Sequence, residues 1–521
     1  MTLSVTSVET GIVMSPRTSH CRRTPFACIL LLLIVLRPET NADQLQAASS
    51  SAPTGPPQVS PDESVLSEYN PEAPPNPNPP PYTLLRFNED YTYLADPRNR
   101  TDPFDPVKYI PLDPDDPKTY LSFGGELRER FEHFTNPGFG VPPNPDDDDY
   151  LRQRIAIHGD LHVTEHFRVF VQGISGLQLG SRQEPPPVNQ DVADLQQAFA
   201  DVRIDDHATS GPAYVVLRGG RFEMTYGSGR LVATRQSPNI PFKFDGGQLI
   251  ATRGGAKVYA FVTRPARERK TQFDDEAPGQ LFWGVYATTP PLIPKAVLRA
   301  DLYYLGLRDD HASYATGTGA ERRQTLGVRL FGRDAGFDYD VEPVLQIGTF
   351  GTRDVLAWTL ASAQGYTMEG LPWSPRLGLQ ADVASGDTEA RGGGHFGTFN
   401  PLFFKAGYFN DASLIRPSNI MDVHPTVQVH PRRSVLLTVG SDILWRYTTK
   451  DGIYGPGGNL ELPAGGGPRY LATSADVSAQ WEIGRHLVWI LSYSHFFTGR
   501  YVRAAKGGDV DYVGSWASFL W

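Results

Sequence analysis

Cysteine is almost absent from this chain, and long apolar runs are absent after its first forty or so residues. Both cysteines, Cys21 and Cys28, lie near the N-terminus, so the rest of the sequence has no thiol for a disulfide or a thiolate ligand. No run of eighteen apolar residues follows, whereas a membrane-spanning helix needs about 20. The mean hydropathy is −0.34. Together these features exclude a helical membrane protein.

Basic charge and catalytic motifs are also scarce. The chain has 48 Lys and Arg against 58 Asp and Glu, a formal charge of −10, which argues against the basic footprint of a nucleic-acid-binding protein. There is no HExxH, CxxC or phosphate-binding loop, and the segment 173–176 lacks the full pattern of a nucleophile elbow. The histidines show no ligand spacing, and the acidic run 146–149 lacks the spacing of an EF-hand. We therefore expect no catalytic residue, no cofactor and no metal site.

The N-terminus has the features of a secretory signal. Arg17, Arg22 and Arg23 precede an apolar run at 29–36, and small residues at 40–42 precede Asp43. A membrane anchor is the alternative, but these eight apolar residues are too few to cross about 30 Å of hydrocarbon at about 1.5 Å per residue. We expect residues 1–42 to be a signal peptide, with the start at Met1 or at position 14 left open. Removing its four basic and two acidic residues leaves 44 basic against 56 acidic residues, a charge of −12.

Residues 43–82 contain eleven prolines among Ser, Asn, Gln and Ala. Such a composition favours an extended, disordered chain that does not bury a core. We expect a Pro-rich disordered linker here. Whether this linker binds a periplasmic protein is left open.

The remaining sequence, 83–521, alternates between apolar and polar residues in one segment after another. In 150–163, one face carries Leu151, Ile155 and Ile157, while the other carries Arg152 and Arg154. An alternation of period two is typical of a strand with one apolar and one polar face. About eighteen such segments occur, beginning near residues 118, 150, 167, 194, 213, 245, 256, 281, 295, 323, 336, 354, 374, 421, 434, 470, 486 and 511.

The spacers between these segments alternate in length. Short spacers such as 164–166, 253–255, 333–335, 431–433 and 482–485 separate long ones, which are 133–149, 178–193, 224–244, 265–280, 307–322, 385–420, 447–469 and 498–509. Transmembrane barrels have short periplasmic turns, longer external loops and an even number of strands. We therefore predict an all-β protein, an antiparallel up-and-down barrel of about 18 strands in a Gram-negative outer membrane. A soluble sandwich or propeller has no reason to show this rhythm. The exception is 350–353, where a long loop is expected and a short one is present.

The cost of placing charge in lipid sets the direction of the polar face. An Arg or Lys at the bilayer midplane of a barrel costs about 2–4 kcal/mol, so strands with several must turn them inward. An eighteen-stranded barrel encloses water, and we expect its lumen to carry both signs of charge. The inward candidates are Glu126, Arg128, Arg130, Glu132, Arg152, Arg154, Gln197, Asp201, Arg203, Arg299, Asp301, Arg329, Asp340, Glu342, Gln346, Gln380, Asp382, Asp442 and Arg446.

An ordered set of short motifs resembles the alginate export family of outer-membrane porins. The motifs are at 86–91, 108–112, 124–130, 195–201, 220–223, 226–231, 244–246, 264–265, 282–286, 384–387, 399–403 and 445–446. They cover the chain after the Pro-rich linker. The C-terminal Trp521, with Phe519 two positions before it, is similar to the aromatic ending by which such barrels are recognised for insertion.

The resemblance implies an eighteen-stranded pore that passes a uronic-acid polysaccharide from the periplasm to the outside through an arginine-rich constriction. A polymer with a carboxylate on each sugar suits guanidinium, which offers a bidentate fork to carboxylate. Interspersed acids keep each site weak enough for release. By position within the motifs, we expect Lys108, Arg128, Arg130, Arg152, Arg154, Arg221 and Arg230 to contact polymer, with Asp201 and Asp245 as counter-charges. Arg–Asp pairs that brace the barrel wall are the alternative for each of these residues.

Two functions from different classes stay open at this point. One is export of an anionic polysaccharide such as alginate, with the outer-membrane lipid and periplasmic synthesis or secretion proteins as partners. The other is a general or substrate-specific diffusion porin for small solutes. A barrel enzyme is a third alternative, but no nucleophile and base are placed together by the sequence.

Overall fold

The computed structural model describes residues 82–142, 146–205, 213–293, 298–389, 393–465 and 467–521. The predicted signal peptide and all of the predicted linker except Tyr82 lie outside these residues. Among the described residues, no helix is long and apolar enough to cross a membrane.

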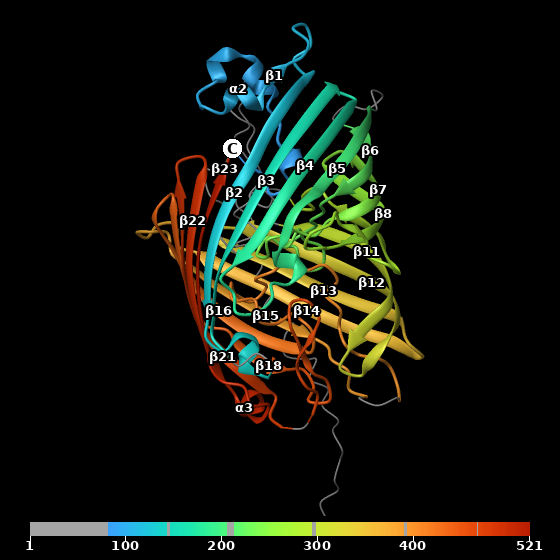
Figure 1. Cartoon of the computed structure of the whole chain (residues 1–521), viewed down its shortest axis with the longest axis vertical. Helices are drawn as coiled ribbons and strands as arrows, with labels where there is room; N and C mark the ends of the chain where they lie inside the picture. The colour runs from blue at the N-terminus through green and yellow to red at the C-terminus, as the bar shows by residue number, and fades with distance from the viewer. Residues whose placement is uncertain (1–81, 143–145, 206–212, 294–297, 390–392, 466) are drawn as a thin grey trace, which may run out of the picture. The chain divides into compact units, whose positions relative to one another are not determined.

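Antiparallel strands make a single closed barrel (Figure 1). Its strands are β2 (Tyr120–Phe134), β3 (Asp148–Thr164), β4 (Phe167–Leu179), β5 (Asp191–Asp205), β6 (Ala213–Phe222), β7 (Phe244–Arg253), β8 (Ala256–Arg267), β10 (Gln280–Thr288), β11 (Arg299–Tyr314), β12 (Gly317–Asp334), β13 (Phe337–Phe350), β14 (Arg353–Thr367), β15 (Arg376–Ala384), β16 (Ile420–Arg432), β17 (Val435–Gly440), β18 (Ile443–Arg446), β21 (Tyr470–Ile483), β22 (Leu487–Thr498) and β23 (Val510–Leu520). Strands β17 and β18 are two halves of one interrupted barrel strand, because both pair with β16 and with β21.

The barrel closes where the last strand meets the first. β23 pairs with β2 from Glu126 opposite Leu520 to Phe134 opposite Tyr512. Counting β17 and β18 as one strand, the barrel has 18 strands. The predicted fold class and strand number are therefore confirmed.

Short strands, helices and turns lie outside the barrel strands. They are β1 (Ile110–Pro111), β9 (Asp275–Glu276), the hairpin of β19 (Ile453–Tyr454) and β20 (Leu460–Leu462), the helices α2 (Asp105–Lys108) and α3 (Arg500–Ala504), and the 3-10 turns η3 (Arg86–Asn88), η4 (Thr92–Ala95), η5 (Pro97–Asn99), η6 (Pro137–Gly140) and η7 (Pro187–Asn189). In Figure 1, α2 and β1 lie at the same end of the barrel as the C-terminus, and α3 lies at the opposite end.

One connection differs from the sequence prediction, and the short connection noted as an exception is confirmed. The prediction of a long loop at 307–322 is wrong, because β11 and β12 continue through it and pair as far as Tyr314 opposite Gly317. Polar residues there look like a loop by composition, yet a hairpin that extends beyond lipid needs no apolar face. The short connection at 350–353 is real, since β13 and β14 stay in register up to Phe350 opposite Arg353, with Gly351 in the left-handed region at φ 57°.

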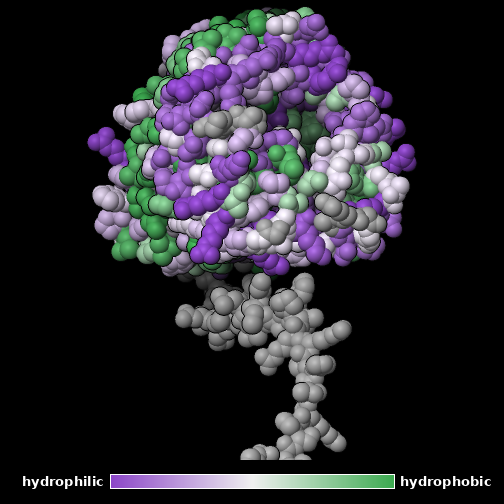
Figure 2. Space-filling view, turned by 60° about the horizontal axis from the view of Figure 1, so that its bottom comes forward, coloured by the Kyte–Doolittle hydropathy of each residue, from purple (hydrophilic) through white to green (hydrophobic). Residues whose placement is uncertain are grey.

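Burial alternates along the strands as a membrane barrel requires. Apolar side chains such as Ile157 and Leu302 are exposed on the outside, whereas Arg128 and Arg154 are at most 2% exposed on the inside. Figure 2 shows apolar residues along the side of the barrel and mostly polar residues over the end that carries the long loops. The apolar side chains therefore face the lipid, and the charged side chains point into the barrel.

The segment before the barrel packs against its closing seam. Arg86 donates to the carbonyl oxygens of Gly125 (3.0 Å) and Trp521 (2.9 Å), one on each side of the β2–β23 junction. Tyr82, which the sequence assigned to the linker, is 4% exposed, and its hydroxyl lies 2.9 Å from His486 Nδ1. Residues 82–119 thus tie the two ends of the barrel sheet together.

The outward face of β3 provides a direct test of the membrane assignment. Replacing Ile155, which is 37% exposed in mid-strand, by Arg is expected to lower the free energy of unfolding by about 2–4 kcal/mol, because a guanidinium would face hydrocarbon. Urea unfolding in lipid vesicles, followed by tryptophan fluorescence, measures this. Ile155→Val serves as the control. Equal stability of the two variants would contradict a lipid-facing outer surface.

Candidate pore-lining site

Four arginines face one another across the first two strands of the barrel. Arg128 is directly opposite Arg154, and Arg130 is directly opposite Arg152, in the register of β2 and β3. Like charges directly opposite on paired strands repel one another. All four are at most 6% exposed, so this wall, which we call the arginine wall, needs compensating groups inside the barrel.

Two glutamates provide part of this compensation. Glu132 accepts from Arg130 at 2.8 Å and also pairs with Arg152. Glu126 lies 3.0 Å from Arg154 Nη2. The ion pairs of the wall with Glu126 and Glu132 set two described carboxylates against four guanidinium groups, so hydrogen-bond donors remain for other acceptors.

Backbone carbonyls of an inserted loop take up much of the remaining donor capacity. The loop 223–243, between β6 and β7, places four consecutive carbonyl oxygens against the arginine wall. Arg128 donates to Gln236 O (2.5 Å) and Pro238 O (2.9 Å), Arg130 and Arg152 to Ser237 O (3.1 and 3.3 Å), and Arg154 to Asn239 O (3.4 Å). We call residues 223–243 the constriction loop.

The opposite side of the constriction loop contacts an acidic wall. Arg230 lies 2.7 Å from Asp340 and 2.9 Å from Glu342, both on β13. Arg329 on β12 also pairs with Asp340 (2.7 Å) and with Asp301 of β11 (3.2 Å). The constriction loop is therefore held between a basic and an acidic wall.

A second inserted loop, 385–419 between β15 and β16, supports the constriction loop. Phe403 accepts from the Ala233 amide (2.8 Å) and donates to Leu231 O (2.9 Å). Its ring packs against Phe244 (5.0 Å between centroids) and Phe282 (4.8 Å). The Phe403 ring also packs against Phe242 of the constriction loop, with 5.4 Å between centroids. The two loops and the barrel wall therefore share an aromatic cluster inside the barrel.

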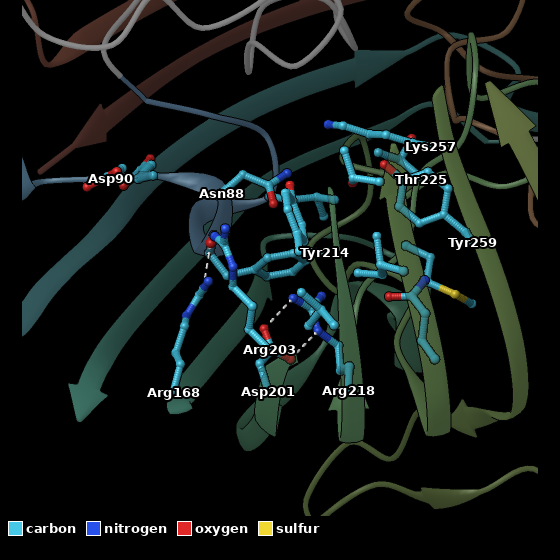
Figure 3. A pocket seen from close by; sticks show the side chains of 18 of the residues that line it. Asn88, Asp90, Arg168, Asp201, Arg203, Tyr214, Arg218, Thr225, Lys257 and Tyr259 are labelled. Atoms are coloured by element: carbon cyan, nitrogen blue, oxygen red, sulfur yellow. Dashed lines mark hydrogen bonds and ion pairs between the residues drawn. The ribbon is translucent and has the colours of Figure 1, made fainter. Parts of the chain in front are cut away.

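A large cavity of about 1360 Å³ lies between the constriction loop and the end of the barrel that carries the short turns between strands. Figure 3 shows Arg168, Arg203, Arg218 and Lys257 around it, together with Tyr214 and Tyr259. Asp201 forms a two-pronged pair with Arg218 at 2.8 and 2.9 Å. Lys257 and Arg299 also line this cavity, and neither forms an ion pair with another described residue. Charges of both signs and aromatic rings thus line the space below the constriction.

The structure separates the predicted site residues into groups. Arg128, Arg130, Arg152 and Arg154 come together at the constriction loop, Arg230 joins the acidic wall, and Asp201 lines the cavity. Their contact with polymer stays a prediction.

Arg221 and Asp245 pair with each other instead, at 2.7 and 2.8 Å. They alternate with Phe222 and Phe244, which are fully buried on the inner face of β6 and β7. This pair lies on the other face of these strands, because successive side chains point to opposite sides.

Lys108 lies in α2 and is absent from the cavity lining. It is 2% exposed, with its ammonium 4.9 Å from the Tyr82 ring and 5.0 Å from the Tyr91 ring. Desolvation by burial, together with the nearby Arg86 charge, lowers the pKa of Lys108 to about 7.

Sequence reasoning missed several residues of the cavity and the role of the loops. Arg168 and Lys257 are the second residues of β4 and β8, next to short turns, and Arg218 lies in the middle of β6. Their alternation with apolar neighbours was the available signal. Nothing in the sequence indicated that carbonyls of 236–239 would meet the arginine wall.

Comparison with known proteins assigns this barrel to a family. A family model for alginate export matches residues 119–515. The chain belongs to the alginate export family. It is therefore an outer-membrane transport channel and not an enzyme. No curated protein matches the sequence.

Solved structures of Pseudomonas aeruginosa proteins share the fold of this alginate export family member. OpdO is 12% identical with a TM-score of 0.54, covering 80% of this chain and 98% of its own. OpdK is 11% identical with a TM-score of 0.53, covering 77% and 98%. OccK2 (OpdF), solved in complex with glucuronate, is 12% identical with a TM-score of 0.51, covering 77% and 97%. At this identity the likeness shows the fold alone.

The buried ammonium of Lys108 predicts a pH dependence of stability. Its pKa is about 7 in the folded protein and about 10.4 when unfolded, so the unfolded state binds more protons between these values and stability rises with pH there. Lys108→Met removes the buried charge. It is expected to be more stable than the parent at pH 7, with the difference shrinking toward pH 10.

Urea midpoints at pH 6, 8 and 10 in detergent measure this effect. Lys118→Met, which removes an exposed lysine of the same segment, is the control. Parallel pH profiles for the parent and Lys108→Met would contradict a strongly lowered pKa.

Proposed function

We propose that this channel exports an anionic polysaccharide of the uronate type, such as alginate, from the periplasm to the cell exterior. The observation that carries the proposal is the arginine wall, whose four buried guanidinium groups are held in part by neutral backbone carbonyls of the constriction loop. Membership of the alginate export family supports the same conclusion.

The chemistry of the wall favours a carboxylate over the loop carbonyls. A hydrogen bond between guanidinium and carboxylate is charge-assisted and roughly twice as strong as one to a neutral acceptor, and the two-oxygen geometry of a carboxylate fits the guanidinium fork. Each uronate unit therefore competes with carbonyls 236–239 for the same donors. On this proposal the constriction loop is the placeholder that the polymer displaces.

The acidic residues limit how tightly any unit is held. Glu126 and Glu132 share the arginines with the cargo, and conduction requires binding weak enough for release. Movement along the wall is then an exchange between neighbouring guanidinium groups. Synthesis of the polymer behind it supplies the direction, and we propose periplasmic synthesis or secretion proteins as partners.

The cavity below the constriction fits the role of a receiving chamber. At about 1360 Å³ it exceeds the roughly 300–1,000 Å³ of an ordinary small-molecule pocket. Lys257 and Arg299 attract carboxylates from the periplasmic side, and Tyr214 and Tyr259 offer ring faces and hydroxyls to sugars. OccK2 (OpdF) has been solved with glucuronate, a uronate monomer, which supports a cargo of this chemistry in a barrel of this fold.

Conductance in planar bilayers tests the proposal. The purified channel is expected to be anion-selective and to be blocked by polyuronate added to the bath. Replacing Arg128 and Arg152 together by Ala should lower anion selectivity and weaken the polyuronate block roughly tenfold or more, because charge-assisted hydrogen bonds are lost. It should also raise conductance, because the constriction loop loses anchors.

Arg322→Ala is the matched control, because Arg322 is exposed on β12 beside the buried Arg323. Cation selectivity that the double substitution does not change would refute the exporter. Ion conductance without polyuronate block would favour the alternative, a diffusion porin for small solutes.

The amount of polymer outside the cell separates the two functions in vivo. Deleting the gene is expected to lower extracellular acidic polysaccharide, and the parent gene, but not the Arg128→Ala, Arg152→Ala form, is expected to restore it. Uronic acid in the culture supernatant is the measurement. Unchanged polymer, with slower uptake of small solutes, would instead identify a diffusion porin.

A further inference from the structure

Three aspartates from two distant parts of the sequence meet at the end of the barrel that carries the long loops. Asp191 and Asp194 begin β5, and Asp274 precedes β9 in the connection between β8 and β10. One carboxylate oxygen of each lies within 4.8 Å of the others. Their exposed fractions are 0%, 4% and 6%, so the three carboxylates, which we call the aspartate triad, are shielded from bulk water.

The nearby positive charge does not balance the triad. Lys243 pairs with Asp194 and lies 2.7 Å from Asp274. Arg221 is 3.7 Å from Asp194, but its guanidinium is engaged two-pronged by Asp245. Three carboxylates against one ammonium leave two negative charges in a buried site.

Asp191 is the member whose charge lacks a partner. Among the residues that the structure describes, none forms an ion pair with Asp191 and none donates a hydrogen bond to either of its carboxylate oxygens. The amide of Ala193 approaches it, but without the geometry of a hydrogen bond. An ionised carboxylate buried in this way is costly unless a cation or a proton neutralises it.

We infer that the aspartate triad binds a divalent cation of the calcium type. Two Ca²⁺–oxygen bonds of about 2.4 Å span about 4.8 Å, and carboxylate oxygens are the ligands this ion prefers. A charge of +2 also cancels the two uncompensated negative charges beside Lys243. Mg²⁺ fits less well, because it requires bonds of about 2.0–2.1 Å in a strict octahedron, and the triad offers no nitrogen or sulfur for a softer metal.

The position of the triad connects the ion to the constriction loop. Lys243, which the triad holds, is the last residue of that loop, and the side-chain amide of Gln196 in β5 donates to Pro241 O at 3.3 Å within the same loop. Asp274 anchors the neighbouring connection, since its backbone amide donates to Asp194 at 2.9 Å. A bound cation would therefore fasten β5, the β8–β10 connection and the foot of the constriction loop together.

The cation site departs from the sequence expectation of no metal. Asp191 and Asp194 are close in sequence, but Asp274 is eighty residues from Asp194. Only the barrel register brings the third carboxylate to them. The inference is independent of the nature of the exported cargo.

Calcium-dependent stability of the full barrel tests this inference. Protein refolded from inclusion bodies into detergent, and hence free of lipopolysaccharide, is melted in EDTA, in millimolar CaCl₂ and in millimolar MgCl₂, and Ca²⁺ binding is measured by calorimetric titration. We expect Ca²⁺ to raise the melting temperature by several degrees, to bind at one site, and to exceed the effect of Mg²⁺.

Two variants and one control locate the effect. Asp191→Asn is expected to abolish the Ca²⁺ response while melting no lower than the parent in EDTA, because a buried uncompensated charge is removed. Asp274→Asn, in a connection outside the barrel wall, should abolish the response as well and covers the case in which Asp191→Asn fails to fold. Asp146→Asn, which changes an exposed aspartate of the first long loop, should keep the full response.

Other results would overturn the inference. Absence of Ca²⁺ binding in the parent, with Asp191→Asn more stable than the parent at neutral pH, would show that a proton neutralises Asp191. A response that survives in both triad variants, or that Asp146→Asn removes, would place the ion elsewhere.

Discussion

The backbone of a chain in hydrocarbon has no water to bond, so every amide and carbonyl must find a partner within the protein. Closing β23 onto β2 meets this requirement without leaving an unpaired sheet edge. The same closure sorts the side chains, because a period of two sends alternate residues to lipid and to the lumen. Charge that the outside does not tolerate is thereby concentrated inside, and the remaining features of the channel are ways of managing that charge.

Inside the barrel, the inserted constriction loop provides partners for the buried charged side chains. Arg128 and Arg130 hold carbonyls of the constriction loop, and Arg230 reaches across to the acids of β13. A buried guanidinium without acceptors is strongly unfavourable, so in the absence of cargo the loop backbone serves as a neutral acceptor. On the proposed function, the groups that keep the channel narrow are the same groups that a carboxylate polymer would use, so the cargo itself would open the channel.

Each end of the barrel is held by contacts between residues that are distant in the sequence. Arg86 bonds to both sides of the closing seam, through Gly125 and Trp521, so a segment outside the barrel wall reinforces the pairing that makes the barrel. At the other end, Lys243 and the aspartate triad hold the foot of the constriction loop. Both anchors join residues that are far apart along the chain. Arg86 and Lys243 both lie outside the strand segments in which apolar and polar side chains alternate.

The sequence by itself determined the class of fold, the strand number and the direction of the arginines on β2 and β3, because alternation and turn spacing are local and the cost of charge in lipid leaves one choice of face. Composition misled at 307–322, where polar residues continue a hairpin beyond the bilayer. Only the tertiary structure decided that carbonyls 236–239 meet the arginine wall, that Arg221 takes Asp245 as its partner, and that Asp274 joins Asp191 and Asp194. These contacts depend on the stagger of neighbouring strands and on the path of long loops inside the barrel, and neither leaves a periodic trace in the sequence.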